Sequence, residues 1–414
     1  MKIIIYGINY YPELTGIGKY TGEMAEYIAS KGHDVRVITA PPYYPEWKVQ
    51  SEYSALKFSK KNINGVEVYR CPLFVPKNPN TILRILHLIS FSLSSFIVLM
   101  TKIFTKPNVL IVVAPSFLCA PAGIFFSKIS GARSVIHFQD FELDAMFGLG
   151  MMKKKGFIAR LVFSFESFIV KKFDIVTTIS RKMIKNLEKK GIPSKKITFF
   201  PNWVDTNFIK PEIANLKNKK KFFNDSSSKI ILYSGNIGNK QGLEIIVDVA
   251  YLMKSYEKIK FIICGSGSNK LDLINYAAQK KIQNMEFIDL VPYDDLPSLI
   301  NSADVHLVIQ KKGSADAFLP SKITTILSSG GYVIVTAEKD TELGILNKQY
   351  PGIIKLVPPE NENSIKKAII ELIDLPENGT NLPARKYAEN FLQKDKIIDD
   401  FIEQFSILKK TNTV

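Results

Sequence analysis

The chain has 414 residues, of which 46% are hydrophobic and 23% are charged. This composition excludes an intrinsically disordered polymer, and the length allows about two to four domains. The net charge of +16 is uneven, because residues 1–205 hold 28 Lys and Arg against 14 Asp and Glu. A basic first half favours an anionic membrane surface, a phosphorylated partner or nucleic acid. Three distant cysteines, Cys71, Cys119 and Cys264, form no disulfide or zinc pattern, which suits a reducing compartment.

Strands alternating with helices are predicted through the first half. Residues 2–6 are expected to form a strand, since the apolar run before Gly7 is too short for a signal peptide. The following loop contains Gly16-Ile17-Gly18, whose main chain can approach a ligand closely, although its spacing is not the dinucleotide fingerprint. Leu86–Met100 falls short of the ~20 apolar residues of a membrane span and contains four serines. We expect a buried core helix there.

Polar residues follow the strand expected at residues 134–137, in the run His137-Phe138-Gln139-Asp140-Phe141-Glu142. Open α/β sheets bind ligands at the carboxyl ends of their strands. A lone histidine is more often structural, but the neighbouring carboxylates make a functional role equally plausible. The lysine-rich segment 146–158 has the composition of a surface that contacts an anionic bilayer, and a solvated loop is the alternative.

A second α/β unit is expected to begin at the strand 230–233, after a polar linker. The glycine turn 234–239 follows, and then a helix from Gly242 with Ile246, Val249, Ala250 and Met253 on one apolar stripe. Such a turn suits either a phosphate or an ordinary βα connection. Further strands are expected at 261–264, 286–290 and 305–309, and the tail 384–408 is expected to form one long helix.

A lysine at the start of a helix is the strongest physical clue in the second half. The helix is expected near Ser321, with Pro320 at its entry and the serine hydroxyl as a cap. Lys322 in the first turn is electrostatically misplaced, because helix N-termini prefer anions. A cation there makes sense if a diphosphate binds at that terminus.

Several stretches form a recognisable set, in order across both halves: Tyr6–Tyr10, Pro12–Glu23, Ile38–Pro45, Gln139-Asp140, Pro201–Asp205, Gly235–Gly238, Gln241–Glu244 and Pro320–Lys322. Together they resemble the family 4 retaining glycosyltransferases of the GT-B fold. The resemblance implies an α/β chain with two Rossmann-like domains whose parallel sheets face each other across a cleft. Residues 1–205 would bind the acceptor, residues 206–384 would bind the nucleotide sugar, and residues 385–414 would form a cross-over helix packing back on the first domain.

The resemblance also implies an activity. A retaining glycosyltransferase would move a sugar from a nucleotide sugar to a polyprenyl-diphosphate-linked saccharide during exopolysaccharide or capsule assembly. GDP-fucose is favoured as donor, with UDP-hexoses close behind, and no metal or other cofactor is expected. The protein would be cytoplasmic and peripherally associated with the inner face of the cell membrane through its basic first half. No nucleic acid is expected as a partner.

The resemblance assigns roles to residues in both halves. Asp140 and Lys322 are expected to be catalytic. The expected acceptor or cleft residues are Glu13, Thr15, Lys19, His137 and Glu142. The expected donor-binding residues are Gly16, Gly18, Gly235, Asn236, Lys240, Gln241, Gly265, Ser266, Gly267, Asp316, Leu319, Ser321, Lys322 and Thr325.

The chain departs from the family where donor-binding charges usually lie. Asn236 and Gln241 stand in place of Arg and Lys, while Ala317 and Thr325 stand in place of paired glutamates. Lys322, with Lys240, is therefore expected to carry the cationic role. Two alternatives remain open: a GT-B sugar-nucleotide 2-epimerase, which needs no acceptor, and a catalytically inactive sugar-nucleotide-binding subunit.

Overall fold

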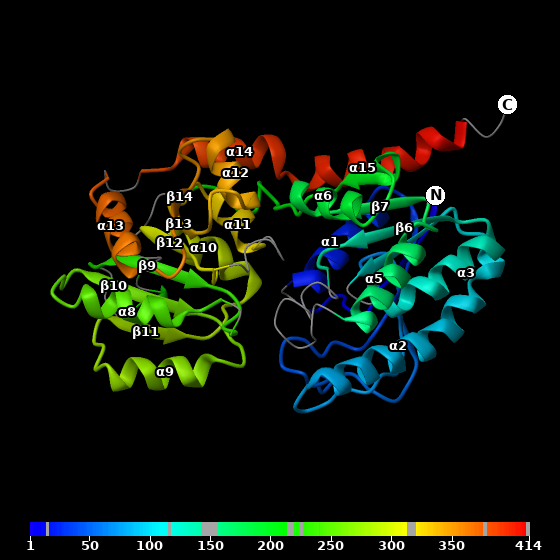
Figure 1. Cartoon of the computed structure of the whole chain (residues 1–414), viewed down its shortest axis with the longest axis horizontal. Helices are drawn as coiled ribbons and strands as arrows, with labels where there is room; N and C mark the ends of the chain where they lie inside the picture. The colour runs from blue at the N-terminus through cyan, green and yellow to red at the C-terminus, as the bar shows by residue number, and fades with distance from the viewer. Residues whose placement is uncertain are drawn as a thin grey trace. The chain divides into compact units, whose positions relative to one another are not determined.

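The computed structural model describes residues 1–13, 16–114, 117–141, 156–212, 219, 221–223, 227–239, 241–312, 320–375 and 379–410. The chain forms two compact units, one of Met1–Pro201 with the segment from Ile398 onward, the other of Asn202–Ile397. In each unit, strands of a largely parallel sheet alternate with helices (Figure 1). The fold class predicted from the sequence, α/β with parallel sheets in two parts, is confirmed.

The first unit is built on an eight-stranded sheet in the order β3-β4-β2-β1-β5-β6-β7-β8. Its strands are β1 (Lys2–Tyr6), β2 (Asp34–Thr39), β3 (Ser59–Ile63), β4 (Val66–Arg70), β5 (Val109–Ala114), β6 (Arg133–Phe138), β7 (Ile175–Thr178) and β8 (Ile197–Phe199). All neighbours are parallel except β3 and β4, which form an edge hairpin. Every residue of β5 is buried, as in a strand covered on both faces.

Helices cover this sheet and carry the chain between parallel strands. They are α1 (Gly16–Ser30), α2 (Thr81–Thr101), η1 (Ile103–Thr105), η2 (Phe117–Cys119), α3 (Ala120–Ser130), α5 (Phe157–Val170), α6 (Arg181–Lys189) and η3 (Ser194–Lys196). The last helix, α15 (Lys394–Lys410), belongs to this unit from Ile398 onward. Its Phe401 ring stacks on Phe200 with centroids 4.0 Å apart. The end of the chain therefore completes the core of the first unit.

The helix α2 is not the buried core helix that the sequence led us to expect. Only 22% of its most apolar window is buried. The buried residues form a single stripe, His87, Phe91, Ser95 and Leu99, and the Ser95 hydroxyl lies 2.8 Å from the Tyr6 hydroxyl of β1. The prediction was wrong because neighbouring elements cover this one stripe and leave the opposite face bare. By length and composition, the helical stretch Thr81–Thr105 could cross a membrane.

The second unit has a six-stranded, wholly parallel sheet in the order β11-β10-β9-β12-β13-β14. Its strands are β9 (Lys229–Ser234), β10 (Ile259–Cys264), β11 (Met285–Ile288), β12 (Val305–Val308), β13 (Val333–Thr336) and β14 (Lys355–Val357). Counted within the unit, the order is 3-2-1-4-5-6, the doubly wound arrangement of dinucleotide-binding sheets. The strand order reverses between β9 and β12. Ligands of such sheets bind at the carboxyl ends of the strands at that point.

The helices of the second unit alternate with its parallel strands along the chain. They are α8 (Glu244–Leu252), α9 (Lys270–Gln279), η4 (Tyr293–Asp295), α10 (Leu296–Asn301), α11 (Lys322–Ser328), α12 (Glu342–Gln349), α13 (Glu362–Ile373) and α14 (Leu382–Phe391). The apolar stripe predicted for α8 is buried in one core cluster. The helix begins two residues later than expected, because Gly242 has a φ of +68° and cannot be helical.

The tail is two helices rather than the single helix expected over residues 384–408. Between α14 and α15, the Leu392 carbonyl accepts from the Val204 amide at 2.8 Å, and the Lys394 amide donates to the Val204 carbonyl at 3.1 Å. These bonds replace helical ones, so Gln393 pairs with Val204 as a parallel bridge. Amphipathic spacing continues through the break, which is why the sequence did not reveal it.

Phe401→Ala should destabilise the first unit by about 3–5 kcal/mol, because it empties a buried aromatic site. Urea unfolding monitored by circular dichroism would measure this loss. Phe104→Ala is the matched control, since Phe104 is 89% exposed and should change stability by less than ~0.5 kcal/mol. Equal losses in the two variants would contradict the packing of α15 on the first unit.

Candidate functional site

Two loops at the carboxyl edge of the second sheet touch through their backbones. They follow β9 and β10, and the Ile237 amide of the first donates to the Ser266 carbonyl of the second at 2.8 Å. A Cβ on Gly265 would lie 1.9 Å from the Gly235 carbonyl oxygen, and one on Gly267 would lie 2.3 Å from the Ile237 carbonyl oxygen. No side chain fits at either position. These glycines are therefore required by the contact between the loops, whether or not a ligand is bound.

Lys322 lies directly against the first of these loops. Its Nζ is 3.5 Å from the centroid of the Tyr233 ring and 2.9 Å from the place where a Cβ on Gly235 would be. Burial lowers the pKa of Lys322 to about 7. Among the described residues it forms no ion pair. The glycine turn and the misplaced lysine, far apart in sequence, thus meet at the reversal point of the sheet.

The helix start at Ser321 differs from the expected cap. Ser321 has a helical backbone (φ −61°, ψ −26°), and its hydroxyl makes no capping hydrogen bond. The Ile323 amide instead donates to the Pro320 carbonyl at 3.1 Å, and the Thr324 amide to the Ser321 carbonyl at 3.3 Å. A serine cap needs an extended backbone, so this part of the prediction was wrong. Thr325 is buried inside the helix. The positive group at this helix start is the Lys322 amine.

The remaining donor-side positions carry little charge. Asn236 is exposed, and its carbonyl accepts from the Tyr233 hydroxyl at 2.7 Å. The buried Gln241 Oε1 has no hydrogen-bond partner among the described residues. The first turn of α8 already holds the carboxylate of Glu244, which accepts from Asn269 Nδ2 at 3.0 Å. That acid disfavours a second anion at the start of α8.

Glu13 organises two loops at the carboxyl edge of the first sheet. Its Oε1 accepts from the Tyr43 and Tyr44 amides at 3.1 Å each, and its Oε2 accepts from Asn9 Nδ2 at 2.9 Å. Burial raises the pKa of Glu13 to about 7, although these hydrogen bonds oppose the shift. A Cβ on Gly18 would lie 2.6 Å from the Cβ of Glu13, so the glycine makes room for this buried acid.

Two further predicted residues of this loop have plain structural surroundings. Gly16 begins α1 with a φ of +60°, which explains a glycine there without any ligand. Lys19 lies 3.8 Å from Glu23, one helical turn later. Both side chains are half-buried, and an i,i+4 pair of this kind on a helix contributes only a few tenths of a kcal/mol to stability.

His137 is buried, and both of its ring nitrogens lie beside polar side chains. Its Nδ1 lies 2.9 Å from the Thr177 hydroxyl, and its Nε2 lies 2.9 Å from Gln139 Nε2. Its ring packs edge-on against Phe200 with centroids 5.0 Å apart. Burial lowers the pKa of His137 to about 3, so the ring is neutral near pH 7. With the amide donating to Nε2, Nδ1 carries the proton.

Asp140 lies half-buried beyond β6, close to the loop that follows β2. Burial raises the pKa of Tyr44, and the charges of Asp140 and Glu13 add to that effect while Arg84 opposes it. The strands that precede these residues, β1, β2 and β6, run parallel in one sheet, with β5 between β1 and β6. Asp140, Tyr44 and Glu13 therefore gather at the carboxyl edge, where the polar run after β6 was predicted to act.

The structure describes most of the predicted site residues. The predicted positions outside the described residues are Thr15, Glu142, Lys240, Asp316 and Leu319, together with residues 146–155 of the lysine-rich segment. Tyr44 and Tyr233 were not singled out from the sequence. Tyr233 could have been found from its place, one residue from the end of a strand that leads into a glycine turn.

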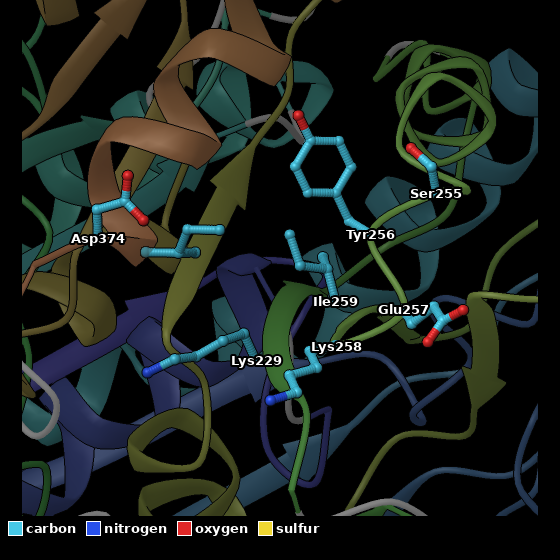
Figure 2. Close-up of a pocket in the computed structure, with 8 residues that line it drawn as sticks. Lys229, Ser255, Tyr256, Glu257, Lys258, Ile259 and Asp374 are labelled. Atoms are coloured by element: carbon cyan, nitrogen blue, oxygen red, sulfur yellow. The ribbon is translucent and has the colours of Figure 1, made fainter.

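A separate hollow of about 430 Å³ lies at the opposite edge of the second sheet (Figure 2). Lys229 and Ile259 line it, and they are the first residues of β9 and β10. Both basic and acidic side chains surround it, and Lys229 already pairs with Asp304 at 3.4 Å. Ligands of doubly wound sheets bind at the other edge, so this hollow is not the donor site. Among the described residues, no group of three or more His, Cys, Asp or Glu could hold a metal ion.

Comparison with known proteins places these features in a family. The model of the glycosyl transferase 4-like domain matches residues 15–203, and that of the glycosyl transferases group 1 matches residues 215–391. The chain is 46% identical over 97% of its length, and 99% of the relative's, to the putative colanic acid biosynthesis glycosyl transferase WcaI of Escherichia coli (strain K12).

Two solved structures share the fold at low sequence identity. Sucrose-phosphate synthase from Thermosynechococcus elongatus has a TM-score of 0.76 at 13% identity, covering 99% of this chain and 100% of its own. Anabaena Alr3699/HepE, in complex with UDP-glucose, has a TM-score of 0.69 at 13% identity, covering 98% and 99%. Together the matches confirm the resemblance and the GT-B fold expected from the sequence.

Gly265→Ala should lower the free energy of unfolding by at least about 2 kcal/mol, because the added methyl group would overlap the backbone of the neighbouring loop. Equilibrium urea unfolding would measure the change. Gly156→Ala is the control, since nothing lies within 4 Å of its Cβ position and its φ of −173° suits any residue. A neutral Gly265→Ala would contradict the backbone contact.

Glu13 should make the stability of the protein depend on pH between about 4.5 and 7. The folded state binds this proton more tightly than the unfolded chain, so the contribution of Glu13 is largest below pH 4.5 and falls as pH rises to 7. The fall amounts to about 3 kcal/mol, at ~1.4 kcal/mol per pKa unit. Glu13→Gln should lack this component in urea unfolding at several pH values. Parallel pH profiles for the two proteins would refute the assignment.

Proposed function

We propose a reaction for this chain on the premise that it belongs to the group 1 family of glycosyltransferases. It moves a sugar from a nucleotide-sugar donor to a polyprenyl-diphosphate-linked saccharide, with retention at the anomeric carbon. The product is an exopolysaccharide intermediate of the colanic acid kind, as the name of the E. coli relative suggests. The observation that carries the proposal is the buried amine of Lys322 at the glycine turn.

Lys322 binds the diphosphate of the donor. Its amine lies where the doubly wound sheet reverses its order, and the HepE neighbour was solved with UDP-glucose. Negative charge on the leaving diphosphate grows as the glycosidic bond breaks. A protonated lysine fixed beside it stabilises that charge more than the ground state. Asn236 and Gln241 cannot add positive charge, so stabilisation of the leaving diphosphate depends more on Lys322.

A pKa near 7 links donor binding to protonation. The free protein holds a partly neutral amine, and a bound diphosphate raises the pKa of Lys322 by attraction. The protein therefore takes up a proton when the donor binds. Donor affinity is highest at or below pH 7 and falls as pH rises above it.

Asp140 and Tyr44 serve the acceptor from the first unit. The half-buried carboxylate of Asp140 and the Tyr44 phenol both lie at the carboxyl edge of the sheet, and the charge of Asp140 raises the pKa of Tyr44. A carboxylate there accepts a hydrogen bond from the acceptor hydroxyl and orients it for transfer. Asp140 is the second catalytic residue that we propose.

The acceptor is lipid-linked, so the protein works from the cytoplasm at the inner face of the membrane. The excess of Lys and Arg in residues 1–205 supports attraction to an anionic lipid surface. GDP-fucose is the proposed donor. A thermal-shift panel of GDP-fucose, GDP-mannose, UDP-glucose and UDP-galactose tests it, because the true donor stabilises the folded state most. Stabilisation by a UDP-hexose alone would replace GDP-fucose in the proposal.

Lys322→Ala should reduce kcat by about 10²–10³-fold while leaving the fold intact, as when one preorganised donor to a developing charge is removed. Lys270→Ala is the control, because Lys270 begins α9 and is paired with Asp289 at 2.6 Å. The control should stay within about twofold. Donor Kd, measured by calorimetry, should rise about tenfold from pH 7 to 8.5 in the wild type and stay flat in Lys322→Ala. Near-normal turnover in Lys322→Ala would refute the proposed role.

A further inference from the structure

The bare face of α2 is a continuous apolar stripe. Its exposed hydrophobic residues recur every three or four positions and include Ile82, Leu86, Ile89, Leu93 and Ile97. Leu93 is 68% exposed and Ile97 is 61% exposed. Soluble proteins rarely leave such a stripe in water, so it marks a surface that binds something apolar.

The serines of α2 do not interrupt this stripe. Ser92 donates to the Leu118 carbonyl at 2.9 Å, Ser90 donates to the His87 carbonyl at 2.7 Å, and Ser94 donates to the Pro72 carbonyl. Ser95 is buried against Tyr6. The residues that argued against a membrane from the sequence are thus satisfied by the protein itself.

Two neighbouring helices extend the apolar surface. Helix α3 packs against α2, and α5 packs against α3. These helices lie on one side of the first unit (Figure 1). The Phe125 ring of α3 lies 6.3 Å from the Phe96 ring of α2. On α5, Leu161, Phe165 and Phe168 are exposed at helical spacing. We call this surface, formed by the outer sides of α2, α3 and α5, the three-helix face.

The charges on the three-helix face have one sign. Arg84, Lys128, Arg160 and Lys172 are exposed on or at the ends of these helices. The helices α2 and α3 contain no Asp or Glu. The one acid of α5, Glu166, is buried and bonded to Lys190 at 2.7 Å. Lys172 lies 4.9 Å from the centre of the exposed Phe168 ring, as when a lysine stem follows an apolar surface.

We infer that the three-helix face embeds in the surface of an anionic bilayer and docks the enzyme there. Apolar side chains rimmed by cations and lacking exposed acids match the acyl boundary and headgroups of such a bilayer. A second copy fits less well, because a two-fold contact would bring the same cations together. The inference rests on the proposed function, from which the lipid-linked acceptor comes. It identifies the surface through which the enzyme contacts the membrane that holds this acceptor.

The helix α2 lies along the bilayer surface rather than across it. Its 21 residues would reach about 31 Å, enough to span the hydrocarbon. However, its stripe of His87, Phe91, Ser95 and Leu99 is buried against the first unit. A crossing helix would have to break those contacts and expose His87 to lipid.

Co-sedimentation with vesicles of phosphatidylethanolamine and phosphatidylglycerol tests the inference on the full chain. The variant Leu93→Glu with Ile97→Glu changes two exposed residues one turn apart, and it should reduce the vesicle-bound fraction at least tenfold. Its control is Leu271→Glu with Leu382→Glu, which adds the same charge at exposed leucines of the second unit. The control should bind as the wild type does. Vesicles of phosphatidylcholine alone should capture less wild-type protein.

Further results distinguish failure of the docking surface from failure of the proposed function. Equal vesicle binding by the Leu93/Ile97 variant and the wild type would overturn the three-helix face as the docking surface. A wild-type dimer in buffer that the variant alone converts to a monomer, with unchanged vesicle binding, would assign the face to a second copy. Transfer to a short-chain, water-soluble acceptor should survive in the variant. Vesicle binding by a wild type that transfers to no lipid acceptor would refute the proposed function and leave the docking surface intact.

Discussion

The donor-side architecture depends on one place where no side chain can fit. The backbone at Gly265 meets the carbonyl of Gly235, and this contact holds the loops after β9 and β10 together. It fixes the turn beside Tyr233, and it leaves over that ring a space that the Lys322 amine fills. The low pKa of the lysine is a result of that enclosure. The absence of side chains at these two glycines thus determines the surroundings, and so the pKa, of the Lys322 amine.

The two units each bury one ionisable side chain at the carboxyl edge of the sheet, but the surroundings of the two side chains differ. Each has an ionisable side chain enclosed at the carboxyl edge of its sheet, Glu13 in the first and Lys322 in the second, and burial moves both pKa values to about 7. Glu13 is surrounded by three hydrogen-bond donors, so it holds loops in place. Lys322 has an aromatic ring and a bare backbone beside it instead. The first arrangement is complete without a ligand, whereas the second has capacity for an anion.

Sequence patterns predicted the structure correctly where the local pattern and the burial of the residues agree. Buried parallel strands, such as the one expected at residues 261–264 and found within β10, were predicted because continuous apolar runs have few other uses in an α/β chain. Lys322 was found because its charge conflicts with a helix start. The face of α2 was missed because composition reports how apolar a helix is, not which neighbours cover it. The break after Phe391 was missed because its cause, pairing with Val204, is distant in sequence.

The pairing of Val204 with Gln393 has a mechanical consequence. The chain passes between the units twice, after Pro201 and after Ile397. Both passages lie within a few residues of this bridge, so the two covalent connections leave the second unit from one point. Backbone hydrogen bonds of Val204 with Leu392 and Lys394 join the two passages inside the second unit, so the two connections cannot separate there unless those bonds break.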